Sequence, residues 1–206
     1  YLPIDQLTAK AASLLKADQE KISDAIAELT VQTQLIAVKF GNETAIYLDY
    51  IYNAERYCAD KLFELSKTAI NIPVEKTEKY IAKAEHEENI IFADKQREAI
   101  MRAVTDGLLI LTGGPGTGKT TVIKAILSLF DALEIETALA APTGRAAKRM
   151  SISTGREAKT IHRLLEADYG EDSRMHFQRD EDNPINAGAV IIDEISMADI
   201  QLLSAL

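Results

Sequence analysis

The segment that most constrains the fold of this chain is residues 113–120, which read GGPGTGKT. It matches the pattern G-x-x-x-x-G-K-[ST], in which glycines let backbone N–H groups form a concave nest around phosphate oxygens. A continuous apolar run, residues 108–111, precedes it and predicts a buried parallel strand. Residues 120–133 follow and predict an amphipathic helix, whose positive N-terminal end favours the same anions. Together they predict a phosphate-binding P-loop.

Two further apolar runs, residues 137–141 and 189–193, predict additional strands. Strands that alternate with helices in this way predict an α/β domain with a parallel sheet. The second run ends in Asp193 and is followed by Glu194. The carboxyl ends of parallel strands share one edge, so we expect Asp193 to face the P-loop.

The residue types at this site predict ATP and Mg²⁺ as cofactors. Lys119 is expected to neutralise the β- and γ-phosphates, and the Thr120 hydroxyl to bind Mg²⁺. Asp193 would hold the Mg²⁺ shell, and Glu194 would polarise the attacking water. The second acid favours an ATPase over a nucleotide kinase or a GTPase.

The N-terminal half shows a different pattern. Residues 1–30 predict two short helices with Asp18 as an N-cap between them, and residues 35–51 predict a β-hairpin. This order occurs in winged-helix modules, and a small α+β packing domain explains it equally well. Further helices are expected over residues 53–69, 75–89 and from an N-cap at Asp94 to about residue 104. The predicted domains are residues 1–52, a helical connector over 53–89, and residues 90–206.

Composition sets broad limits. The net charge is −9, yet residues 107–166 hold eight Lys and Arg against five Asp and Glu, so a locally basic surface is possible. No apolar run approaches the roughly 20 residues of a membrane span. Cys58 is the single cysteine and lies in a helical apolar pattern, which predicts a core residue and a cytoplasmic location.

Three segments are less specific when taken alone. Residues 141–149, APTGRAAKR, follow a predicted strand and suit contact with a nucleic-acid backbone, although an exposed basic helix is the alternative. His162 in TIHRLL is, by spacing alone, more often a hydrogen-bonded structural residue. Gln96 could read an adenine edge with its amide.

Together, GGPGTGKTT, APTGRAAKR, TIHRLL and VIIDEISM resemble motifs I and Ia, the segment after Ia, and motif II of superfamily 1 helicases. The similarity is strongest to the RecD/TraA branch, and FADKQ at residues 92–96 matches the position of its Q motif. The resemblance covers residues 90–206. It implies an ATP-dependent, 5′-to-3′ DNA helicase of recombination and repair that acts on single-stranded or tailed DNA.

The resemblance also assigns individual residues. It places Gln96 against adenine and adds Thr121 to the nucleotide contacts. The expected nucleotide-binding set is Gln96, Gly114, Gly116, Thr117, Gly118, Lys119, Thr120 and Thr121. The expected DNA-binding set is Pro142, Thr143, Arg145 and His162.

The chain also departs from the family. It begins with Tyr1 and stops twelve residues after Glu194, so motifs III to VI and the second RecA-like lobe are missing. We therefore expect an α/β P-loop NTPase (RecA-like) sheet, incomplete at its C-terminus, preceded by a smaller helical or winged-helix-like domain. We also expect weak Mg·ATP binding, poor hydrolysis and no unwinding. Two alternatives are another P-loop ATPase of the AAA+ type and a DNA-binding module with a vestigial nucleotide site.

Overall fold

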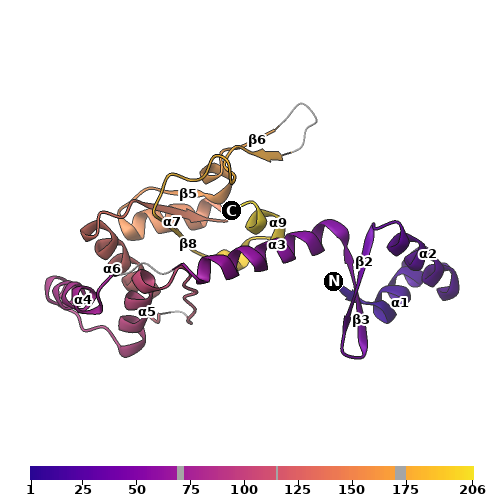
Figure 1. Ribbon diagram of the computed structural model, residues 1–206, viewed down its shortest axis with the longest axis horizontal. Helices are drawn as coiled ribbons and strands as arrows, with labels where there is room; N and C mark the ends of the chain where they lie inside the picture. Colours follow the sequence, from indigo (N-terminus) through magenta and orange to yellow (C-terminus); the bar gives the residue numbers. More distant parts are fainter. Residues whose placement is uncertain (69–71, 115, 170–174) are drawn as a thin grey trace. The chain divides into compact units, whose positions relative to one another are not determined.

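The computed structural model describes residues 1–68, 72–114, 116–169 and 175–206. The chain forms two compact units, Tyr1–Ala59 and Asp60–Leu206 (Figure 1). Within the described ranges, no helix combines the length and the apolar character that a membrane span requires. The predicted domain boundaries near residues 52 and 89 stay a prediction.

The first unit packs two helices against a small antiparallel sheet with the strand order β1-β3-β2. Its elements are β1 (Leu2–Pro3), α1 (Ile4–Leu15), α2 (Gln19–Val31), β2 (Leu35–Phe40) and β3 (Glu43–Leu48). Ile22 and Ile26 of α2 pack on Ile46 of β3 to form its core. The two predicted helices and the hairpin are confirmed. The hairpin ends at Leu48 rather than at residue 51, because the next helix already begins at Asp49.

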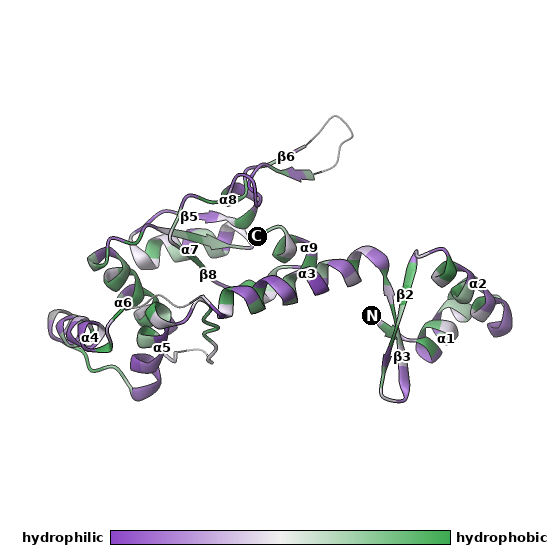
Figure 2. Ribbon diagram, in the orientation of Figure 1, coloured by the Kyte–Doolittle hydropathy of each residue, from purple (hydrophilic) through white to green (hydrophobic). Residues whose placement is uncertain are grey.

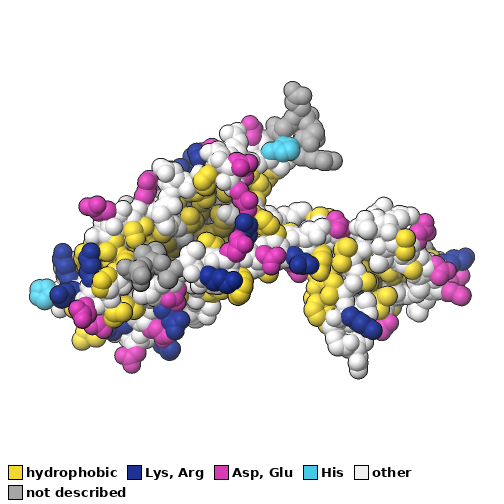
Figure 3. Space-filling view, viewed as in Figure 1, with side chains coloured by type: hydrophobic (Ala, Val, Ile, Leu, Met, Phe, Trp, Pro, Cys, Tyr) yellow, Lys and Arg dark blue, Asp and Glu magenta, His cyan; other side chains and the backbone are white. Residues whose placement is uncertain are grey.

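Aromatic rings gather on the hairpin side of this unit. The ring centroid of Tyr47 lies 5.2 Å from that of Tyr1 and 5.4 Å from that of Tyr52, and Phe40 lies 6.2 Å from Tyr1. Tyr47 is buried, whereas Tyr1 and Phe40 are exposed. Hydrophobic side chains are visible along this side in Figure 3. The rings therefore attach the first residue of the chain to the hairpin.

Three helices precede the P-loop: α3 (Asp49–Ser66), α4 (Val74–Glu88) and α5 (Asp94–Thr105). Hydrophobic and hydrophilic residues alternate along α3 (Figure 2), as expected for an amphipathic helix, and Cys58 is buried on it. The predicted end of this helix at Ala69 lies outside the described residues. The predicted N-cap at Asp94 is wrong, because Asp94 is already helical and Ala93 is the cap. The side chain of Gln96 accepts the Ala93 backbone N–H at 3.0 Å instead.

The second unit contains the predicted parallel sheet, with the strand order β5-β4-β8. Its remaining elements are α6 (Lys119–Ala132), β4 (Thr137–Ala141), α7 (Gly144–Thr154), β5 (Ala158–Thr160), α8 (Ile161–Leu164), β6 (Ala167–Tyr169), β7 (Met175–Phe177), β8 (Ala189–Ile192), the 3-10 turn η1 (Ile195–Met197) and α9 (Ile200–Ser204). Strand β4 is central and pairs in parallel with both neighbours. The α/β fold class is therefore confirmed.

Successive residues of β4 point to opposite faces and so build two layers of core. Leu139 packs with Leu127 of α6 and Met150 of α7 on one face. Ala140 packs with Ile161 of α8 and Leu202 of α9 on the other. Helices therefore cover both faces of the sheet, as is typical of parallel sheets.

The prediction of a strand over residues 108–111 is wrong: these residues form no ladder within the described part of the chain. Their side chains still alternate as in a strand, since Leu109 and Leu111 pack on the core near Ala189 and Ile191 while Ile110 is 72% exposed. A strand needs a neighbour that completes its backbone hydrogen bonds. Strand β8 is the last strand of the described sheet, and it pairs only with β4.

The core around α5 generates a stability prediction. Ile100 is 1% exposed in the cluster that joins α4, α5 and α6, whereas Ile152 on α7 is 76% exposed. Ile100→Ala should lower the free energy of unfolding by about 2–5 kcal/mol, because it removes buried methyl groups and leaves a cavity. Ile152→Ala should change it by less than about 0.5 kcal/mol. Urea unfolding followed by circular dichroism measures both, and equal losses would contradict the packing.

Candidate nucleotide site

The P-loop backbone takes a conformation that only glycine adopts freely. Gly116 and Gly118 have φ angles of 74° and 81°, in the left-handed region. Gly118 is also the N-cap of α6, and a Cβ there would lie 2.4 Å from the side-chain nitrogen of Gln96. By contrast, a Cβ on Gly114 or Gly116 would meet no heavy atom within 4 Å. The loop therefore presents open backbone on one side and is closely packed on the other.

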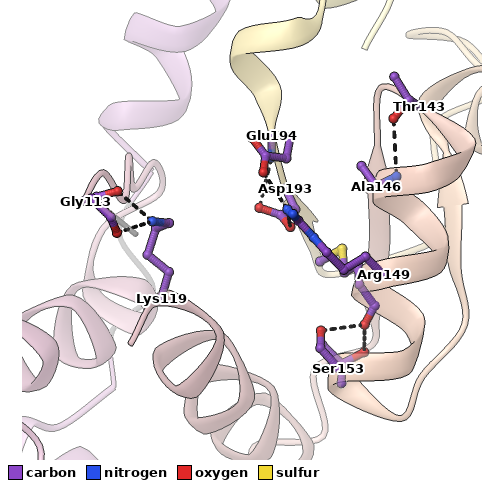
Figure 4. A network of polar contacts seen from close by, with 11 residues as sticks. Gly113, Lys119, Thr143, Ala146, Arg149, Ser153, Asp193 and Glu194 are labelled. Carbon is purple, nitrogen blue, oxygen red and sulfur yellow. Dashed lines mark hydrogen bonds and ion pairs between the residues drawn. The ribbon is translucent and has the colours of Figure 1, made fainter. Parts of the chain in front are cut away.

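Lys119 begins α6 and is turned back onto the loop (Figure 4). Its Nζ donates hydrogen bonds to the carbonyl oxygens of Gly113 at 2.6 Å and Gly114 at 2.9 Å. The Thr117 hydroxyl also donates to the Gly114 carbonyl, at 2.9 Å. Thr120 and Thr121 follow on the first turn of α6 and are exposed. The ammonium group is thus held beside the backbone that a phosphate would approach.

Gln96 connects α5 to the P-loop. Its Nε2 donates to the Thr117 carbonyl at 3.1 Å, while its Oε1 accepts the Ala93 backbone N–H. The predicted role against adenine stays a prediction. The contacts show that the amide ties the segment before α5 to the loop that would hold the phosphates.

Glu85 on α4 supports this segment, and the sequence reasoning missed it. One carboxylate oxygen accepts the backbone N–H of Phe92 at 2.9 Å, and the other accepts Arg97 at 2.7 Å. The hydrogen bond from Arg97, followed by that from Phe92, holds the pKa of the Glu85 carboxyl below its usual value. Within an acidic helix, nothing in the sequence distinguished Glu85 from its neighbours.

The two predicted acids leave the carboxyl edge of the sheet together. The Asp193 N–H donates to the Ala140 carbonyl at 3.0 Å, which continues the β4–β8 ladder by one residue. Glu194 has a φ of 56°, a left-handed conformation that is uncommon for a residue with a Cβ. Its N–H donates to Asp193 Oδ1 at 3.0 Å. The chain therefore turns sharply at the point where both carboxylates emerge.

Arg149 of α7 contacts both acids (Figure 4). Its Nη2 lies 2.5 Å from a carboxylate oxygen of Glu194 and 3.6 Å from Asp193 Oδ2. The hydrogen bond to Glu194 and the negative charges of both acids raise the pKa of the guanidinium. The sequence placed Arg149 in a basic segment but assigned it no role, because a contact between residues 45 positions apart leaves no local signal.

The predicted DNA contacts lie at the same edge of the sheet. Residues 142–145 follow β4 and residues 161–162 follow β5, and Ala141 at the end of β4 pairs in register with Thr160 at the end of β5. Thr143 caps α7 by accepting the Ala146 N–H at 3.3 Å, so its hydroxyl has a structural role. Pro142 is partly buried, and Arg145 is exposed. The His162 ring is partly buried, 6.2 Å from that of Phe177.

Residues 96–206 match a family model described as an AAA domain. The chain belongs to this family.

Known relatives are similar to part of this chain. The chain is 41% identical over 115 residues to the ATP-dependent RecD2 DNA helicase of Deinococcus radiodurans, covering 55% of this chain and 15% of that protein. It is 36% identical over 136 residues to the RecBCD enzyme subunit RecD of Mycobacterium tuberculosis, covering 55% and 23%. For the RecBCD enzyme subunit RecD of Haemophilus influenzae the identity is 30% over 157 residues, covering 64% and 23%. The resemblance to the RecD branch is confirmed, and the chain spans less than a quarter of these relatives.

Glu85 generates a pH-dependent prediction. Because its folded-state pKa is lowered, its contribution to stability is present above the unfolded value of about 4.3 and is lost as the pH falls through the folded value. Glu85→Gln should therefore lower the melting temperature at pH 7, and the difference from the wild type should close at acidic pH. Scanning calorimetry between pH 3 and 7 measures it. Glu78→Gln, at an exposed position on the same helix, is the control, and a pH-independent gap for Glu85→Gln would contradict the assignment.

Proposed function

We propose that this chain supplies the phosphate- and metal-binding half of the ATP site in a 5′-to-3′, RecD-like DNA helicase of recombination and repair. The observation that carries the proposal is the common edge of the sheet. There, the carboxylates after β8 emerge beside the segments that follow β4 and β5, and the P-loop leads into α6, which packs on β4. Single-stranded or tailed DNA is the proposed partner.

The residues at this edge fit Mg·ATP. The left-handed glycines and the start of α6 provide backbone N–H groups for phosphate oxygens. Lys119 would exchange its two carbonyl partners for the β- and γ-phosphates. Thr120 would bind Mg²⁺ directly and Asp193 partly through water, since hard cations prefer oxygen ligands. Glu194 would orient the attacking water and accept its proton. Gln96 would lie beside the adenine, and Thr121 would add a nucleotide contact.

The proposed DNA contacts are Pro142, Thr143, Arg145 and His162. The register between β4 and β5 supports them, because it brings the two segments that carry them to adjacent strand ends. The exposed Arg145 would contact the phosphate backbone, whereas the partly buried His162 would contact a base or sugar. A DNA-processing role and the single buried cysteine support a cytoplasmic location.

Lys119 provides the test of the nucleotide site. Lys119→Ala should weaken binding of a fluorescent ATP analogue by about 10–100-fold, because one charge-assisted contact of about 1.5–3 kcal/mol is lost. Lys124→Ala removes the same charge from an exposed position on the same helix and should bind normally. Fluorescence anisotropy measures both. Equal affinity of Lys119→Ala and the wild type would instead support a DNA-binding module with a vestigial nucleotide site.

We further propose that these 206 residues bind Mg·ATP but turn it over slowly and separate no strands. In related P-loop enzymes an arginine from another domain or partner contributes about 10³–10⁵ in rate, and translocation needs two lobes that close around the nucleotide. A fluorescence unwinding assay on a DNA duplex with a 5′ single-stranded tail should give no displacement above background with the 206-residue chain. Strand separation at a rate of order 1 s⁻¹ or faster would overturn this proposal.

A further inference from the structure

The contact between Arg149 and the two acids has a consequence for metal binding. A guanidinium 2.5 Å from Glu194 and 3.6 Å from Asp193 lies where both carboxylates direct their negative charge. A divalent cation placed beside Asp193 would be repelled by that positive charge. The guanidinium and the metal ion therefore compete for Asp193, while Glu194 makes the shorter contact that holds the guanidinium there.

The backbone that carries Arg149 is fixed, so its side chain is the part that moves when a metal ion takes the place of the guanidinium. Its helix neighbours Ala147 and Met150 are buried against the sheet. Ser151 ties the helix to β5, since its Oγ accepts the Ala158 N–H at 2.9 Å and donates to the Ala147 carbonyl at 3.0 Å. The side chain of Arg149 itself is 64% exposed. Displacement of the guanidinium thus requires rotation of one side chain and no movement of α7.

The two carboxylate oxygens of Asp193 have different partners. Asp193 Oδ1 already accepts the Glu194 N–H, so Oδ2 is the oxygen that faces Arg149. Glu194 follows in its left-handed backbone conformation, which fixes where its side chain emerges. The oxygen that a metal ion would take on Asp193 is therefore the one beside the guanidinium.

We propose that Arg149 is a positioning residue whose guanidinium, paired with Glu194, occupies the cation position beside Asp193, and that Mg²⁺ arriving with the nucleotide must displace it. The proposal rests on the proposed function of the same acids. While Arg149 is paired, Glu194 directs its carboxylate to the guanidinium, and it is free to accept a proton from water only after the exchange. The arginine thereby links metal arrival to the readiness of the general base.

Because the ion pair between Arg149 and the acids is exposed to solvent, its effect on Mg²⁺ binding is limited in size. Exposed ion pairs change an equilibrium constant by at most a factor of about five. Arg149 should therefore raise the Mg²⁺ concentration needed for nucleotide binding by a few-fold without blocking it. Such a contact biases the order of events but does not lock the site.

The experiment titrates Mg²⁺ into the 206-residue chain with a fluorescent ADP analogue and records the midpoint of the Mg²⁺-dependent rise in anisotropy. Arg149→Ala should lower this midpoint about three- to five-fold. Affinity for the analogue in EDTA should stay the same. The effect of Arg149→Ala should shrink in a Glu194→Gln background, where the shorter of the two contacts has lost its charge. Melting temperatures of all variants verify that they fold.

Lys148→Ala is the matched control, because it removes one positive charge from the adjacent exposed position on the same helix. Equal midpoints for Arg149→Ala and Lys148→Ala would overturn the proposal, as would a raised midpoint. Weaker binding of Arg149→Ala in EDTA would also overturn it, since the arginine would then contact the nucleotide. Nucleotide binding that survives Lys119→Ala would instead remove the proposed function, and the inference with it. The two failures are therefore distinguishable.

Discussion

The parallel pairing of β4 with both of its neighbours is the constraint on which the candidate site depends. Because all three strands run in one direction, their carboxyl ends reach the same edge of the sheet. Residues 142–145, 161–162 and 193–194 therefore emerge side by side, although they are up to 52 positions apart in the chain. An antiparallel neighbour would have sent one of these segments to the opposite edge. Helices also pack on both faces of β4.

Bringing these segments together creates an electrostatic requirement. Two carboxylates and an arginine lie together at this edge, and Lys119 lies at the start of α6, and each of these charged groups has a partner of opposite charge or polarity. The structure provides them internally: Lys119 binds loop carbonyls, and Arg149 binds the acids. Gln96 likewise has partners at both ends of its amide. Each of these contacts uses a group to which we assign a role toward Mg·ATP, so in the proposed function ligand binding would exchange one set of partners for another.

The sequence predicted the elements of the second unit well because local patterns specify them. The P-loop, β4 and the helix after the loop all follow from apolar periodicity and glycine spacing, and they begin and end within a residue or two of their expected bounds. The strand over residues 108–111 failed for a nonlocal reason. Its continuous apolar run is visible in the sequence, but a ladder depends on a neighbour that no local pattern reveals. The contacts of Glu85 and Arg149 were not predicted for the same reason, since each residue acts through a partner on another element.

Stability and chemistry are carried by separate parts of the second unit. The fully buried residues, such as Ile100, Val104 and Val122, join α5 and α6 below the P-loop. The contacts at the sheet edge are polar and largely exposed, and contacts of that kind add little to the free energy of folding. The partners of Lys119 and Arg149 can therefore change without loss of the core. Gln96 is the connection between the two parts, because it sits on the helix that the core holds and bonds to the loop that must accommodate the phosphates. The hydrogen bond from Gln96 to the Thr117 carbonyl thus gives the loop backbone a direct contact with α5.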